Sequence, residues 1–427
     1  MADLSRRRFV KLCSAGTCGA AIHRMFPLAG GMLAFASPER ASAMGPNPIM
    51  VVVNFAGGAS YNVAPIYGGY YRDRNPNVSF SDTDSDALPL SSEQGLHPSL
   101  TYFKQIWDEG HLALLNLVGY PNPNRSHAES ADIWFQGLRN ASVANGGGWG
   151  ARLTCQIANT FGGISVAGQN TLVQGDCGLQ PGYLPRPLGN LTNFGEDSFD
   201  SDWGVGSYSR HLRLVRDDMV FKSTFASNQS SSYVRNSMVG LSESLARIAA
   251  ELNPQTNPLP PGVTFPNNGF GNQCRDAARL IGAAGLGIRF IFLEIGGFDT
   301  HSDERPNLTN LMNNVNAGLQ GLIQTAKIRG LWDRLIIMTM SEFCRTHEND
   351  SEGTDHGHGG PMYVMGGAVV GGIKSPTPTA AETVGDFYRN HHIHFCEPFY
   401  QAVQAMGLNA DLVFPEPFSR RNFTLFG

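Results

Sequence analysis

Four apolar runs, each ending in a polar segment, most strongly limit what this chain can fold into. Each run is rich in β-branched or large aliphatic residues and is apolar on both faces, as strands are in a sheet covered on both sides. Helical patterns recur between the runs, so the strand–loop–helix order predicts an α/β fold with a central, mostly parallel sheet flanked by helices. With 50 glycines and 25 prolines, long ordered loops are expected as well. The four runs are Ile49–Phe55, Leu112–Val118, Ile288–Ile295 and Leu335–Met340.

Polar and ionisable side chains follow all four runs. In open α/β sheets, ligands bind beyond the carboxyl ends of the strands, so we expect these side chains to meet at one edge of the sheet. In chain order they are Ser60 and Asn62, then Ser126 and His127, then Asp299 and His301, and finally Glu342 with Asp355, His356 and His358.

The last two groups have the composition of a metal site. Asp299 and His301 are two residues apart, so in extended backbone they share a face. Glu342 ends a strand, and a loop flanked by Gly353 and Gly360 then carries one acid and two imidazoles. Carboxylate oxygens and imidazole nitrogens suit zinc, manganese or iron, and glycine lets the backbone approach closely. A hydrogen-bonded surface turn is the alternative, but such turns would not gather acids and histidines at several strand ends.

A helix is predicted from about Arg125 to Gln136, with Asn124 as its N-cap. Ser126 then falls in the first turn, where free amides and the helix dipole favour anions. It is therefore a candidate nucleophile or phosphate or sulfate ligand, or else an ordinary first-turn serine.

The N-terminal segment has the pattern of a twin-arginine export signal. Arg6, Arg7 and Arg8 precede a weakly apolar region, and Ala41-Ser42-Ala43 is a small-x-small cleavage site. We expect residues 1–43 to be removed after contact with the twin-arginine translocase, leaving residues 44–427 as a single domain that is periplasmic or secreted. The alternative is an uncleaved membrane anchor. No later apolar run is long enough to predict a stable membrane span after processing.

Charge and cysteine content narrow the function classes. Without residues 1–43, 25 basic and 34 acidic residues remain, and no basic patch stands out, so nucleic acid is not an expected partner. The five remaining cysteines are widely spaced and include no C-x-x-C pair, so they predict neither a disulfide framework nor a thiolate metal site.

Four segments together resemble a known family. They are GYPNPNRSH (119–127), GGFDTH (296–301), SEFCR (341–345) and GTDHGHGG (353–360). In this order they resemble the twin-arginine-exported domain-of-unknown-function family 1501, which is similar to the alkaline phosphatase/sulfatase superfamily. The resemblance implies that Asp299, His301 and one or both of His356 and His358 hold a metal, and that Ser126 lies in the nucleophile region. It also implies that Glu342 replaces the acid of a strand-end Asp-His pair.

Departures from the family pattern affect the expected metal count. Ser60 stands where many relatives carry an acid that would bind a second metal, and Phe343 follows Glu342 where a histidine is common. The predicted cofactor is therefore one divalent ion, zinc, manganese or calcium, rather than two. The sulfatase C-x-P-x-R motif is absent.

Three functions remain open from the sequence. The first is a metal-dependent hydrolase or transferase acting on a small anionic phosphate or sulfate ester, in which Ser126 or water attacks and Arg125, His127 and Arg345 assist by binding the anion. The second is a non-catalytic secreted binding or assembly protein with a degenerate one-metal site. The third is a serine hydrolase using Ser126, although no G-x-S-x-G elbow supports it.

Overall fold

The computed structural model describes residues 44–81, 87–138, 147–157, 162–167, 171–175, 247–248, 250–389 and 391–427. These residues all belong to one compact unit, Glu39–Gly427. The predicted export signal, residues 1–43, lies outside the described residues and stays a prediction.

The main sheet of the described part has eight strands in the order β11-β4-β10-β7-β1-β6-β5, with β14 pairing with β4 as well. β10 runs antiparallel to β4 and β7, and the other pairs are parallel. The strands are β1 (Ile49–Ala56), β4 (Leu112–Gly119), β5 (Gly163–Ser165), β6 (Phe290–Gly296), β7 (Leu335–Met340), β10 (Gly360–Met365), β11 (Gly372–Ile373) and β14 (Ile393–His394).

The first predicted strand lies inside the sheet, between β6 and β7. Val51 of β1 pairs with Ile291 of β6 on one side and with Ile337 of β7 on the other. All four predicted runs are strands, β1, β4, β6 and β7, with bounds that differ by at most two residues. Since these four strands point the same way, the polar segments that follow them emerge at one edge.

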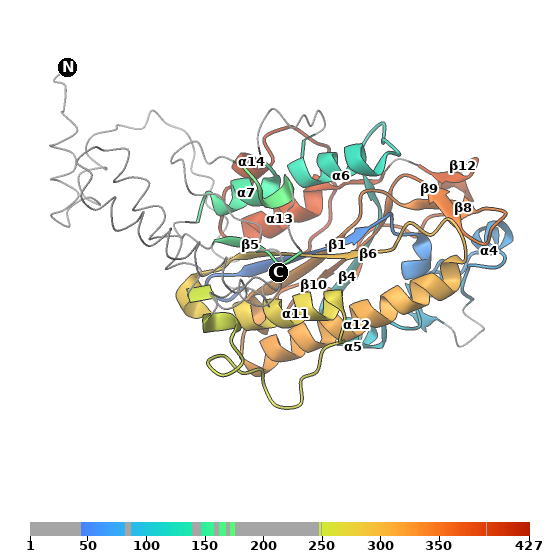
Figure 1. Cartoon of the computed structure of the whole chain (residues 1–427). Helices are drawn as coiled ribbons and strands as arrows, with labels where there is room; N and C mark the ends of the chain where they lie inside the picture. Colours follow the sequence, from blue (N-terminus) through green and yellow to red (C-terminus); the bar gives the residue numbers. More distant parts are fainter. Residues whose placement is uncertain are drawn as a thin grey trace, which may run out of the picture. The chain divides into compact units, whose positions relative to one another are not determined.

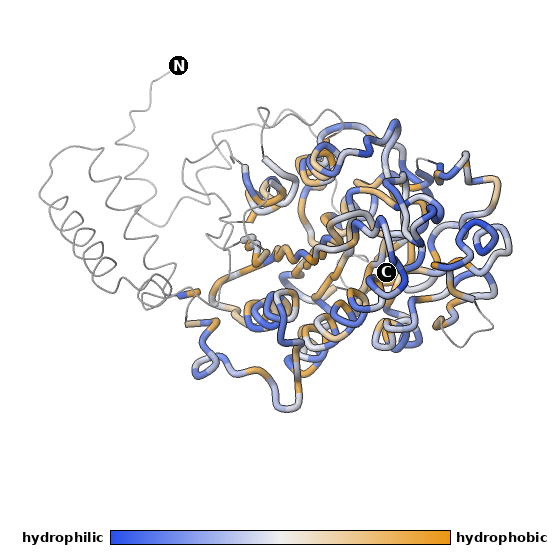
Figure 2. The backbone as a smooth tube through the Cα atoms, turned by 45° about the vertical axis from the view of Figure 1, so that its right-hand side comes forward, coloured by the Kyte–Doolittle hydropathy of each residue, from blue (hydrophilic) through white to orange (hydrophobic). Residues whose placement is uncertain are grey.

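Helices cover both faces of the sheet (Figure 1). One layer contains α5 (Thr101–Asp108), α11 (Gly269–Leu280) and α12 (Glu304–Ile328), and the other contains α6 (His127–Gln136), α7 (Trp149–Thr154), α13 (Cys396–Ala405) and α14 (Ala410–Val413). Alternate residues of β1 enter opposite cores, with Val51 and Val53 on the first side and Met50 and Val52 on the other. Figure 2 shows the apolar chain segments concentrated between these layers. The predicted fold class is confirmed.

Smaller elements lie at the strand ends and edges. They are α4 (Gly69–Arg74), the strand pairs β2 (Leu88–Pro89) with β3 (Gly95–Leu96), β8 (Arg345–Glu348) with β9 (Thr354–His356) and β12 (Thr383–Val384) with β13 (Phe387–Tyr388), and the 3-10 helices η1 (Tyr61–Val63), η3 (Thr171–Val173), η5 (Ala284–Leu286), η6 (Trp332–Arg334) and η7 (Ala380–Glu382). Of these, β8 and β9 carry the predicted site residues Arg345, Asp355 and His356.

The cysteines are mostly core residues. Cys274, Cys344 and Cys396 are free and buried, and burial raises the pKa of the Cys274 and Cys396 thiols. Cys155 is disulfide-bonded, which the spacing of the cysteines did not predict.

Among the residues described, no helix combines the length and apolar character needed to cross a lipid bilayer.

His97 is a buried histidine in the segment between β3 and α5. It is fully buried, its Nδ1 accepts a hydrogen bond from the Ser99 amide at 3.1 Å, and its ring contacts Phe80. Burial, and then the nearby Arg305, lower its pKa to about 3. The folded protein therefore holds His97 neutral where the unfolded chain, with a pKa of about 6.5, binds a proton.

We expect His97→Gln to flatten the acid side of the stability profile. Below about pH 6.5 the unfolded state binds more protons at His97, so acidification lowers the free energy of unfolding, by up to about 1.4 kcal/mol per pH unit. Urea unfolding between pH 5 and 7 measures this slope. An unchanged slope in His97→Gln would contradict the assignment.

Candidate metal centre

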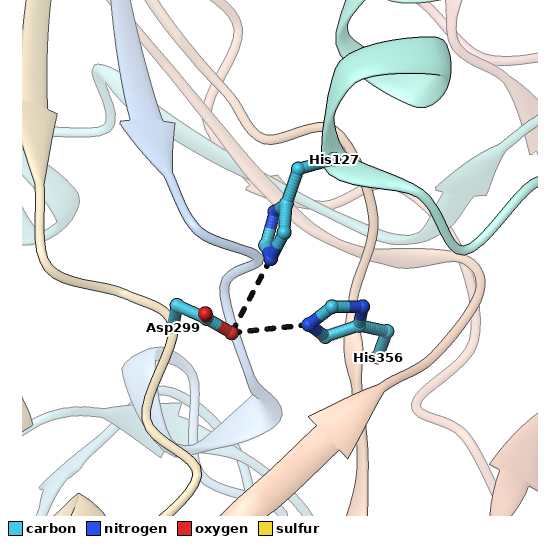
Figure 3. Close-up of side chains that lie close together, drawn as sticks. All are labelled: His127, Asp299 and His356. Carbon is cyan, nitrogen blue, oxygen red and sulfur yellow. Dashed lines mark hydrogen bonds and ion pairs between the residues drawn. The ribbon is translucent and has the colours of Figure 1, made fainter.

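The segments after β4, β6 and β7 meet at one edge of the sheet. His127 begins α6, Asp299 follows β6, and His356 ends β9 in the loop beyond β7. One ligand atom from each of these three residues lies within 4.8 Å of the other two. Figure 3 shows their side chains converging from three separate elements. The predicted gathering of distant groups is therefore observed for these residues.

One oxygen of Asp299 is the centre of the cluster. Its Oδ1 lies 3.4 Å from Nε2 of His127, 3.0 Å from Nε2 of His301 and 3.1 Å from Nε2 of His356. The Nε2 atoms of His301 and His356 are 3.2 Å apart. In a tetrahedral site with bonds of about 2.0–2.1 Å, neighbouring ligand atoms are about 3.3 Å apart. The observed separations match this ligand-to-ligand distance, and those of 3.0–3.2 Å also match hydrogen bonds.

The other ring nitrogen of each histidine is held by an acceptor. Nδ1 of His127 lies 2.8 Å from Oε1 of Glu342, and Nδ1 of His301 lies 2.8 Å from Oδ1 of Asp355. Nδ1 of His356 lies 2.8 Å from the backbone oxygen of Arg125. A carbonyl or carboxylate oxygen only accepts, so each Nδ1 carries the proton.

The three Nε2 atoms are directed at one carboxylate oxygen. Nε2 of His127 is buried without a hydrogen-bond partner among the described residues. Lone pairs of His301 and His356 at van der Waals contact would repel each other and Asp299 unless a proton or metal cation lies between them. Carboxylate–histidine pairs of this kind typically orient metal ligands.

Glu342 and Asp355 therefore stand behind histidines rather than beside Asp299. Oε1 of Glu342, a residue only 5% exposed, also accepts a hydrogen bond from the Gly57 amide at 2.8 Å. Both acids were predicted as ligands. In the structure, these two acids contact the cluster through His127 and His301. His127 itself faces Asp299, whereas the sequence analysis proposed it only as a residue that binds the substrate anion.

Arg345 is a buried cation beneath the cluster. Its side chain is fully buried, and its guanidinium donates to Oδ1 of Asp299 at 2.6 Å and to the Gly57 carbonyl at 2.9 Å. Partial burial raises the pKa of Asp299, but the hydrogen bond and charge of Arg345 outweigh this, so the pKa lies below the ordinary value. Asp299 thus carries a negative charge at neutral pH. The expectation that Arg345 binds a substrate anion does not fit its complete burial.

An aromatic ring fixes two of the imidazoles. Phe343 stacks on His356 with ring centroids 4.9 Å apart, and it lies at the same centroid distance from His127. Phe343, which follows Glu342 where a histidine is common in the resembled family, therefore packs against ligand candidates here.

The structure does not bring His358 into the cluster. Its Nδ1 donates to the Tyr388 carbonyl at 2.9 Å, and its ring stacks on Phe387. Burial lowers the pKa of His358, so it is a neutral packed residue beside the site.

Ser126 is exposed at the start of α6. It is the N-cap of the helix and makes no side-chain capping bond, so the prediction of Asn124 as N-cap is wrong. Instead, Oδ1 of Asn124 accepts from the Ser126 amide at 2.7 Å, closing a turn before the helix. Both neighbours of Ser126 touch the cluster, Arg125 through its carbonyl and His127 through its ring. The Arg125 guanidinium lies over Phe387.

Comparisons with known proteins agree with part of this description. Residues 219–414 match the family described as Protein of unknown function (DUF1501), in agreement with the predicted resemblance. The matched residues include Asp299, His301 and His356 but not His127. The sequence matches no curated protein.

Similar solved structures include one named as a sulfatase and one named as an alkaline phosphatase. "Ps i-CgsB in complex with k-i-k-neocarrahexaose" has 11% identity and a TM-score of 0.38, covering 85% of this chain and 73% of that one. The PsFucS1 sulfatase from Pseudoalteromonas sp. has 11% identity and a TM-score of 0.39, covering 88% and 74%. Wild-type alkaline phosphatase PafA has 10% identity and a TM-score of 0.31, covering 71% and 64%.

Gly57 permits the close approach of three segments at the cluster. Its φ is +121°, and a Cβ here would lie 2.3 Å from the Asp299 amide nitrogen. We expect Gly57→Ala to lower the free energy of unfolding by more than about 2 kcal/mol, because backbone strain and overpacking add. Gly110→Ala is the control, since Gly110 has φ +80° but open space around its Cβ position. Urea unfolding that gives the two variants equal stability would contradict the steric argument.

Proposed function

We propose that this protein binds one divalent metal ion through His127, Asp299, His301 and His356, and hydrolyses a phosphate or sulfate ester there. The observation that carries the proposal is the orientation of the imidazoles. Each Nδ1 is bound to an acceptor, and each Nε2 lies within 3.4 Å of the same Asp299 oxygen. One metal ion placed between these nitrogens and the Asp299 oxygen would be bound by all four ligand atoms, which supports the proposal.

The donor set favours zinc over calcium. Three imidazole nitrogens and one carboxylate oxygen suit zinc, and manganese or iron next, whereas calcium takes oxygen ligands. The fit of the ligand separations to a tetrahedral edge supports zinc further. Arg345 already neutralises part of the charge of Asp299, which supports one metal rather than two.

The groups around the cluster support ester hydrolysis as the proposed reaction. A divalent ion held here would neutralise negative charge that develops on the ester and polarise it. The hydroxyl of Ser126 is exposed at a helix N-terminus, between two residues that touch the cluster, so it can attack phosphorus or sulfur as the bond to the ester oxygen breaks. The serine proton passes to solvent, the leaving alcohol takes one from solvent, and water then releases phosphate or sulfate.

The remaining residues have supporting roles in this proposal. Arg125 is exposed, and its carbonyl contacts His356, so its guanidinium is the candidate group for binding the anionic ester. Glu342 and Asp355 keep His127 and His301 in the metal-binding tautomer. The twin-arginine pattern of residues 6–8 supports export of the folded, metal-loaded protein to the periplasm or beyond.

A non-catalytic binding protein is the second candidate. The contact between Arg345 and Asp299, at 2.6 Å, favours it because a guanidinium on a ligand oxygen weakens that oxygen as a metal donor. The two candidates share the metal site and differ only in turnover.

His356→Ala should abolish stoichiometric zinc binding, whereas His358→Ala should retain it. The two histidines lie in the same loop, but only His356 faces Asp299. Metal analysis of purified protein after dialysis, with a zinc competition titration, measures the difference. Loss of zinc in His358→Ala together with its retention in His356→Ala would reverse the ligand assignment.

Ser126→Ala should lower kcat for a phosphate or sulfate ester by at least about 100-fold if its hydroxyl is the nucleophile. Bound zinc should stay at one per chain, because the serine side chain holds no ligand. Turnover is followed with an ester panel on the zinc-loaded protein. Full activity in Ser126→Ala would assign the attack to water, and no turnover by the wild type on any ester would favour the binding protein.

A further inference from the structure

Glu304, the first residue of α12, carries a fully buried carboxylate. Oε1 accepts from Oγ of Ser60 at 2.6 Å and from Nδ2 of Asn62 at 2.7 Å. Oε2 accepts from Oγ1 of Thr300 at 3.1 Å and from Oγ1 of Thr354. Four neutral donors thus surround one buried negative charge.

Two of these donors, Thr300 and Thr354, belong to segments that carry the proposed ligands. Thr300 lies between Asp299 and His301, and Thr354 precedes Asp355 by one residue. The two segments are also joined directly, because the Thr354 amide donates to the Thr300 carbonyl at 2.8 Å. Glu304 is therefore hydrogen-bonded to both segments and contacts none of the proposed ligands.

A single hydroxyl group links the Glu304 carboxylate to a buried cation by hydrogen bonds. Oγ1 of Thr354 donates to Glu304 and accepts from Nε of Arg345 at 3.2 Å. The guanidinium of Arg345 in turn donates to Asp299. A buried carboxylate needs a compensating charge, and Arg345, itself fully buried, is the cation linked to Glu304 by this chain of hydrogen bonds.

We propose that Glu304 is a positioning residue that raises the metal affinity of the cluster by sharing the positive charge of Arg345 with Asp299. The inference rests on the proposed metal site. With Glu304 ionised, the guanidinium is attracted to two carboxylates, and Asp299 keeps more of its negative charge for a metal ion. With a neutral group at position 304, the charge of Arg345 acts on Asp299 alone, and Thr300 and Thr354 lose their anionic acceptor.

Glu304→Gln tests the charge while keeping the shape. The hydroxyls of Thr300 and Thr354 can turn to accept from an amide, so the fold is expected to persist, as thermal unfolding and circular dichroism will check. The Kd for zinc should rise by about 10-fold or more, the usual effect of losing a group that supports a metal ligand. Competition titration with a chelator of known zinc affinity gives the Kd without any assay of activity.

Glu397→Gln is the matched control. Glu397 is also a buried carboxylate, 4% exposed, and it accepts a hydrogen bond from Gln401 at 3.1 Å, but it lies on α13 in the opposite helix layer. The same substitution there should leave the Kd for zinc unchanged. An equal rise in both variants would mean that lost stability, not the Glu304 charge, weakens binding.

Glu304→Asp separates charge from packing. Aspartate keeps the negative charge but is shorter, so it should retain more zinc affinity than glutamine if charge sharing is the cause. A weaker Kd for Glu304→Asp than for Glu304→Gln would overturn the inference.

Two outcomes distinguish this inference from the proposed function. Equal Kd values in the wild type and Glu304→Gln would overturn the role of Glu304 and leave the metal site standing. No zinc binding by the wild type would overturn both. These zinc titrations do not measure ester turnover, so a lack of turnover in a separate assay would contradict only the proposed hydrolase activity.

Discussion

The site depends on the interaction of the negatively charged Asp299 carboxylate with the imidazole and guanidinium groups around it. Three imidazoles approach one of its oxygens from α6, from the segment after β6 and from β9, and a buried guanidinium approaches the same oxygen from β8. Without that charge, Arg345 would be a buried cation lacking its carboxylate, and the imidazoles would face one another. The strand order makes this meeting possible, because β6, β1 and β7 are neighbours and end at one edge of the sheet.

Much of the framework could be predicted from apolar patterning alone. The runs that form β1, β4, β6 and β7 are buried on both faces, and a parallel strand in such a position typically appears in the sequence as a nearly continuous apolar run. Residue type and strand-end position also predicted that Asp299, His301 and His356 lie close together. These groups lie together because parallel strands deliver their following loops to a common edge, which is a rule of the fold rather than of any side chain.

The roles within the site could not be read in the same way. Glu342, Asp355 and His358 have the chemistry of ligands, but which atom a carboxylate or imidazole meets depends on register and rotamer. His358 differs from His356 by two residues, and it donates to the Tyr388 carbonyl instead. Glu304 escaped the sequence analysis altogether. Its only signal was an acid at a helix start three residues after His301, a placement that ordinary helices also favour.

The central position of β1 has a consequence for how the protein is made. Asn54 pairs with Glu294 and with Met340, so the middle strand is synthesised long before either neighbour. Contacts this distant in sequence form slowly, and a nascent chain released only as far as β4 has neither partner for its most buried strand. The cation-binding groups come together only after β9 has left the ribosome. A chaperone that shields β1 during translation would therefore act before any ion could help the chain to fold.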